Sequence, residues 1–263
     1  MILLGLFWLV LLLGPIPVGA HDFSAADQYF ANRENNLSNL KRAEDLYQDA
    51  LNQVAGQDLL YAVQQLGKIY YYWGELLTPE DKKDVRKSIF GRCRAMVERI
   101  HPNIVGDNAA YSYWKSTCFA FWVKSATTPE VMGVRDELLA ALREGLSRWD
   151  NYEEGGIHRT AATVYMCRNS ERDEHFVGLY DENKASYHIH QALEKDQNKK
   201  HYCAHLLKAE VLLARGKRED AQEWLEESKM ELDQRIASNQ LPCDALAESK
   251  AVSILMAAFL STL

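Results

Sequence analysis

The sequence predicts an all-α protein in which tetratricopeptide-like antiparallel helix pairs stack into a curved array with a C-terminal capping helix. After Ala20 the apolar residues recur at three- and four-residue spacing, the helical period, and no stretch alternates as a strand does. The clearest repeat places a small residue, a turn glycine, a second small residue and a bulky apolar residue at Ala209, Gly216, Ala221 and Leu225. This spacing is typical of the tetratricopeptide repeat of about 34 residues.

The segment 1–20 has the pattern of a secretory signal peptide. It contains no charged side chain, the apolar run Ile2–Leu13 is followed by Pro15 and Pro17, and the small residues Val18–Ala20 precede the expected cleavage site. An uncleaved membrane anchor is the alternative, although the apolar run is short for a bilayer span. No cysteine follows the small residues, so lipoprotein tethering is not expected. We expect a periplasmic or secreted protein with no stable membrane span after cleavage.

The segment 21–263 is expected to form a single helical-repeat domain of about five helix pairs plus the C-terminal cap helix. The net charge of −7 at pH 7 argues against nucleic-acid binding, because phosphate contacts need a basic face. The sequence lacks the common nucleophile, zinc-protease and phosphate-loop motifs, so we predict no enzyme, no cofactor and no metal site. His188 and His190 lie two apart on a predicted helix and therefore cannot share a metal from one face.

The first predicted helix begins at a cap, Asp22 or Ser24, and runs to about Asn32. A turn is expected at 37–39, followed by a helix over Lys41–Gln53 with small and aromatic residues at repeat positions. These two helices form the first pair.

The second and third pairs share a helix-start signal. Thr78-Pro79-Glu80 and Thr128-Pro129-Glu130 each place a proline in a first helical turn, where its missing N–H is harmless. The helices that follow are expected to end near His101 and Trp149. Gly67 predicts close approach of a neighbouring helix, because glycine inside a helix costs about 1 kcal/mol relative to alanine.

The C-terminal half continues the same pattern. A turn at 150–156 should precede a helix over Ile157–Cys167, and an irregular polar insertion is expected over 168–181. The remaining helices are expected over Lys184–Glu194, Tyr202–Arg215, Glu219–Gln234 and the cap helix Asp244–Leu260.

Five cysteines occur, at positions 93, 118, 167, 203 and 243. Their irregular spacing and the lack of a Cys-x-x-Cys pair argue against zinc. Because an oxidising compartment permits disulfides, a link between Cys167 and Cys203, which lie about one repeat apart, is one reading. Separate thiols buried at packing positions are the other reading.

The first helix of each pair is expected to line the concave face of the array. Counting from the small residue of each first helix predicts a cluster of cations and aromatic side chains on that face: Lys68, Tyr71, Lys115, Trp122, His158 and Tyr165. Arg159 is adjacent to His158 and could add a bidentate donor. Cations set among aromatic rings in an acidic protein predict a cleft for an organic anion or an acidic peptide segment. The alternative is that the lysines are solvated and the aromatic rings belong to the core of the repeats.

The run Tyr152–Arg159, YEEGGIHR, with Tyr165 further on, resembles a segment of the T component of TRAP-type transport systems. Lys184-Ala185, Ala192 and the stretch Ala209–Leu225 continue the resemblance. The resemblance implies an all-helical periplasmic protein with a central pore or cleft, associated with a solute-binding subunit. It also implies self-assembly, as a homo-oligomer such as a trimer.

The leading hypothesis is therefore a secreted helical-repeat protein that acts as an accessory of a TRAP-type uptake system. It would bind a periplasmic solute-binding subunit and a small organic anion in the cationic and aromatic cleft. The alternative is a ligand-free scaffold of the cell envelope that makes only protein–protein contacts.

Overall fold

The computed structural model describes residues 21–34, 37–100, 107–167, 179–196, 201–238 and 243–263, and the predicted signal peptide lies outside them. The described residues form helices and connecting loops without a strand, so the all-α prediction is confirmed. The helices are α1 (Ser24–Ala31), α2 (Leu37–Leu51), α3 (Gly56–Tyr71), the π-helix η1 (Tyr72–Leu77), α4 (Lys83–Arg99), α6 (Ala109–Ser125), α7 (Thr128–Arg148), α8 (Gly156–Tyr165), α10 (Glu182–Lys195), α11 (Cys203–Ala214), α12 (Arg218–Ala237) and α13 (Cys243–Leu260).

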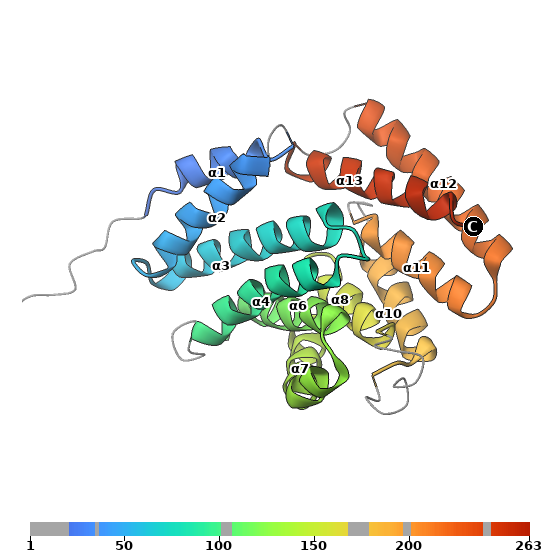
Figure 1. The fold of residues 1–263 in the computed structure, drawn as a ribbon, viewed down its shortest axis with the longest axis horizontal. Helices are drawn as coiled ribbons and strands as arrows, with labels where there is room; N and C mark the ends of the chain where they lie inside the picture. Colours follow the sequence, from blue (N-terminus) through green and yellow to red (C-terminus); the bar gives the residue numbers. More distant parts are fainter. Residues whose placement is uncertain (1–20, 35–36, 101–106, 168–178, 197–200, 239–242) are drawn as a thin grey trace, which may run out of the picture.

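Helices adjacent in the sequence pack against one another along the array, as expected for stacked helical repeats (Figure 1). The long helix α7 lies at the outside of the array and packs mainly against α6 and α8, with an ion pair of 2.6 Å from Lys87 of α4 to Glu130 at its N-terminus. A core of buried apolar side chains extends along the array from Ala26 in α1 to Met256 in α13.

The array curls until its two ends meet. The last helix, α13, packs against η1, and the Lys250 ammonium of α13 forms an ion pair of 2.9 Å with the Glu34 carboxylate just after α1. Stacking alone joins only neighbouring repeats, so this contact between residues 216 positions apart brings the two ends of the array together beside its inner face.

Glycines allow the closest helix contacts. A Cβ at Gly67 would lie 2.2 Å from Cδ2 of Trp114, so the indole of α6 rests on the bare backbone of α3, as the sequence predicts. At Gly145 of α7, a Cβ would lie 2.7 Å from Cδ1 of Ile157 in α8. Side chains at either position would push these helices apart.

The two Thr-Pro-Glu signals have different outcomes. At 128–130 a helix does start, with Thr127 and Glu130 forming a capping box at the N-terminus of α7. At 78–80 the predicted start is wrong, because α4 begins at Lys83. The chain continues past α3 into η1, and the Thr78 hydroxyl donates to the Trp73 carbonyl at 2.8 Å, closing that turn instead. The turn predicted at 37–39 is also wrong, since α2 already begins at Leu37.

One disulfide joins Cys93 of α4 to Cys118 of α6, with the two Cα atoms 5.3 Å apart. Of the two readings for Cys167 and Cys203, the link is wrong and separate thiols are found, because both are free and Cys203 lines one cavity while Cys167 lines another. Among the described residues, every helix is too short or too polar to cross a membrane.

Candidate functional site

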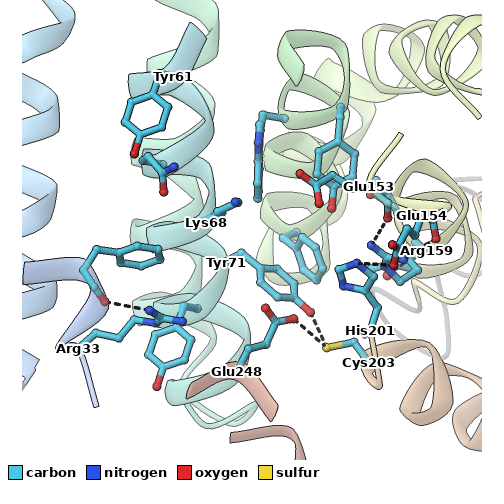
Figure 2. Close-up of a pocket in the computed structure, with 18 of the residues that line it drawn as sticks. Arg33, Tyr61, Lys68, Tyr71, Glu153, Glu154, Arg159, His201, Cys203 and Glu248 are labelled. Carbon is cyan, nitrogen blue, oxygen red and sulfur yellow. Dashed lines mark hydrogen bonds and ion pairs between the residues drawn. The ribbon is translucent and has the colours of Figure 1, made fainter. Parts of the chain in front are cut away.

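The curled array encloses a cavity of about 1010 Å³ that is lined by side chains from both ends and the middle of the chain (Figure 2). Helices α3 and α6 form one wall, the turn before α8 and the start of α11 form another, and α1 and α13 close the space between them. The lining combines aromatic rings with charged groups, as is usual for sites that bind small organic molecules.

Lys68 points from α3 into the middle of this cavity (Figure 2). Within the part of the chain that the structure describes, no hydrogen bond or ion pair is made by its ammonium, whereas Lys115, Lys124 and Lys195 each pair with a carboxylate. A half-buried ammonium without a counter-ion is unfavourable, and an anion in the cavity would relieve that cost.

Arg159 is held at the cavity wall by the turn that precedes α8. Glu153, Glu154 and Gly155 all have left-handed backbone conformations, with φ of 49°, 50° and 82°. This turn aims two carbonyl groups at the guanidinium, which donates to the Glu153 oxygen at 2.9 Å and to the Glu154 oxygen at 3.1 Å. The planar group is thereby fixed in orientation, and no carboxylate of the described residues forms an ion pair with it, a suitable arrangement for recognising a carboxylate.

A short polar chain crosses the floor of the cavity. The Tyr71 hydroxyl donates to the Cys203 sulfur at 2.8 Å, and that sulfur lies 3.8 Å from Oε1 of Glu248 in α13 (Figure 2). Burial is the largest effect on all three groups and raises the pKa of Tyr71, of Cys203 and of Glu248. The Tyr71 hydroxyl and the Cys203 thiol are therefore neutral at physiological pH, and protonation of Glu248 is favoured.

Aromatic rings form most of the remaining wall. Trp114 and Phe121 of α6 and the Tyr113 ring line the cavity, and burial raises the pKa of Tyr113 to about 12. Near α1, the Asp27 carboxylate accepts hydrogen bonds from the hydroxyls of Tyr47 and Tyr61, so this acid is already satisfied. An apolar or aromatic ligand body would fit against these rings.

Comparison of the chain with protein-family models finds no match, and neither does a comparison with curated proteins. Fold alone does not specify a function, so the chemistry of the cavity must carry the assignment.

Three of the seven sequence-predicted residues line the cavity together: Lys68, Tyr71 and Arg159. Lys115 does not, because its side chain is turned toward α7, where it forms an ion pair of 3.2 Å with Glu137. Trp122 packs between α6 and α4, with the guanidinium of Arg94 4.6 Å from its ring centroid.

His158 and Tyr165 lie in the contact between α8 and α10. The His158 ring meets that of His188, and the Tyr165 ring stacks on His188 with their centroids 5.6 Å apart. Both residues thus serve the packing of two helices and do not line the cavity. Tyr165 and Trp122 therefore fit the alternative interpretation, in which the aromatic rings belong to the core of the repeats.

The sequence reading missed the cavity residues Arg33, His201, Cys203 and Glu248. Arg33 and Glu248 come from the two ends of the chain, and only closure of the array brings them to the cavity. His201 and Cys203 lie at the start of α11, one turn before the inner-face positions that the repeat count selects. The pattern of apolar and polar residues along one helix predicts neither the closure of the array nor the placement of residues before the inner-face positions of α11.

A second cavity of about 510 Å³ adjoins the first, since Thr163 and Leu207 line both. Two of its three lining cations are already paired, because Glu75 accepts hydrogen bonds from Arg86 at 2.7 Å and from Lys124 at 2.8 Å, while the third, Lys83, comes from the first turn of α4. We therefore assign the candidate site to the larger cavity. Among the residues that the structure describes, no group of three His, Cys, Asp or Glu side chains is arranged to hold a metal ion.

Proposed function

We propose that this chain is a non-enzymatic binding protein that takes an organic anion with an apolar or aromatic body into its central cavity. The anionic group lies between Lys68 and Arg159, and the body of the ligand packs against Trp114 and Phe121. The proposal extends the sequence-based hypothesis of an accessory to a TRAP-type solute uptake system, acting outside the inner membrane.

The observation that carries this proposal is the unpaired ammonium of Lys68 inside an aromatic cavity. Lys124, which is similarly enclosed, is paired with Glu75, and Lys195 is paired with Asp150. A half-buried charge without a partner lowers stability, so selection for stability alone would not favour a lysine at position 68. Binding of an anion gives the charge a partner.

The geometry of Arg159 supports the same proposal. The run Tyr152–Arg159, which resembles the T component of TRAP-type systems, builds the left-handed turn that orients this guanidinium. Its remaining N–H groups are available for a bidentate contact with a carboxylate. A solute-binding subunit as protein partner and self-assembly into a trimer remain predictions from the resemblance.

Binding of naphthalene-2-carboxylate to the K68M variant tests the proposal. Methionine keeps the unbranched stem of the lysine and removes the charge, so we expect affinity measured by isothermal titration calorimetry to fall by at least about tenfold. K115M is the matched control, because Lys115 lies outside the cavity and pairs with Glu137, and its affinity should equal that of the wild type. An equal loss of affinity in K68M and K115M would show that the probe does not bind in the cavity.

Native mass spectrometry of the protein purified from its source tests the rival, a ligand-free scaffold. The proposal expects a bound small acid whose release requires denaturation, and loss of that mass in K68M. An empty protein that retains a protein partner would favour the scaffold.

A further inference from the structure

Among the residues whose side chains the structure describes, Glu248 is the acidic residue that α13 contributes to the cavity lining, and it lies close to Tyr71 and Cys203 (Figure 2). Its carboxylate has a single neighbour at hydrogen-bonding distance, the Cys203 sulfur at 3.8 Å. Within the described part of the chain, no cation forms an ion pair with it. Glu248 therefore faces the same cations that an anionic ligand would use, without being neutralised by any of them.

The charges around Glu248 come from every element at the cavity floor. Arg159 of α8, Arg33 after α1 and Lys68 of α3 all favour its ionised form, whereas burial opposes that form more strongly. The titratable groups near it include the Cys203 thiol and the hydroxyls of Tyr71, Tyr72 and Tyr113, and the His201 imidazole also lines the cavity. The thiol and the three hydroxyls have a raised pKa and stay neutral near pH 7, so Glu248 and His201 are the groups that the variants below must distinguish.

We propose that Glu248 competes with the acid group of the ligand, and that an organic anion binds between Lys68 and Arg159 together with one proton, which Glu248 takes up. The inference rests on the proposed function of the cavity and identifies how the site is regulated. A carboxylate or sulfonate in the cavity would face an ionised Glu248 at close range, and two like charges in one buried site cannot both remain. The proton comes from solvent and leaves again with the ligand.

Proton linkage gives the direction in which ligand affinity changes with pH. Binding of the anion further favours protonated Glu248, so the pKa of this group is higher in the complex than in the free protein. Affinity is therefore constant at pH values below the free-protein pKa and falls by at most about tenfold per pH unit above it. A ligand taken up in acid would be released as the pH rises.

The experiment is isothermal titration calorimetry of the full mature chain with naphthalene-2-carboxylate and naphthalene-2-sulfonate. Titrations between pH 5 and 9, in buffers of different ionisation enthalpy, count the protons taken up on binding. The sulfonate cannot itself be protonated in this range, so proton uptake with that probe must come from the protein. We expect uptake of up to about one proton with both probes.

The E248Q variant should bind both probes without this uptake, and its affinity above neutral pH should rise to the low-pH value of the wild type. Glu34→Gln is the matched control, because Glu34 lies on the outer contact with Lys250 and should leave the proton count unchanged. If E248Q does not fold, the sulfonate is titrated into the wild type and into His201→Gln: uptake that persists in His201→Gln supports Glu248, and uptake lost there overturns the assignment.

Binding of both probes with no proton uptake would overturn this inference and leave the proposed function intact. Proton uptake that persists in E248Q and is lost in His201→Gln would also overturn the inference and leave the proposed function intact, because His201 also lines the cavity. Failure of the wild type and of E248Q to bind either probe would overturn both proposals.

Discussion

The imidazole rings of His158 and His188 face each other in the protein interior, with their Nδ1 atoms 2.9 Å apart. One ring donates a proton and the other accepts it, so at least one ring must be neutral. Burial and the nearby charges of His188 and Lys195 lower the pKa of His158 to about 4, and burial together with Lys184 lowers the pKa of His188. The contact between α8 and α10 is therefore sensitive to acid.

The pair predicts that the protein loses stability in mild acid. The folded-state pKa of His158 lies below the unfolded value of about 6.5, so the unfolded chain binds more protons as the pH falls. Stability is fully present above the unfolded value and is lost between about pH 6.5 and about pH 4, by about 3 kcal/mol from His158. Urea unfolding at pH 7.5 and pH 4.5 measures this change.

Two variants isolate the contribution of the histidine pair. H158Q/H188Q should lose less stability than the wild type over the same pH range. H190Q should behave as the wild type, because His190 is exposed on the same helix. An acid-induced loss in the double variant as large as that of the wild type would contradict the assignment.

Gly67→Ala should destabilise the protein even though alanine is the better helix former. Its Cβ would lie within the Trp114 ring contact, and overpacking of this kind costs about 1–3 kcal/mol. In contrast, Gly133→Ala of α7 has open space for its Cβ and should stabilise by about 0.5–1 kcal/mol. The two free energies of unfolding, measured with urea, should change in opposite directions, and changes of the same sign would show that Trp114 moves aside.

Removal of the α4–α6 disulfide should weaken the protein without unfolding it. The bond closes a loop with a sequence separation of 25, for which the chain-entropy model predicts about 3 kcal/mol of stabilisation. C93A/C118A should therefore show a lower urea midpoint. Peptide mapping of the unreduced protein should recover Cys93 linked to Cys118, and a peptide linking Cys167 to Cys203 would contradict the structure.

The Glu34–Lys250 ion pair should affect ligand exchange more than stability. The pair is solvent-exposed and is worth at most about 1 kcal/mol, but it joins the two ends of the array beside the cavity. Charge reversal in K250E should speed the dissociation of naphthalene-2-sulfonate in stopped-flow experiments. The exchanged double variant E34K/K250E should restore the slow rate, and equal rates in all three proteins would exclude this role.

Local sequence patterns predicted the helices well because helical period, turn glycines and capping residues all act over a few positions. The close contact at Gly67 and the helix start at Thr128-Pro129-Glu130 are examples. The cavity was predicted only in part, since the repeat count assumes identical repeats. Lys115 departs from the count because α7 packs against α6 and offers Glu137 as a partner. Glu248 has no local signal at all, because closure of the array places it.

The closure of the array also bears on the order in which this protein folds. Stacked repeats can form one after another, because each needs only its neighbour. The pocket lining, however, includes Glu248 from the last helix and Asp27 from the first, so no partial chain contains a finished pocket. The lining is completed only when α13 docks against the early helices across a long sequence separation, which is a slow step in chain assembly. A truncated or nascent protein would therefore be helical and still unable to retain a ligand.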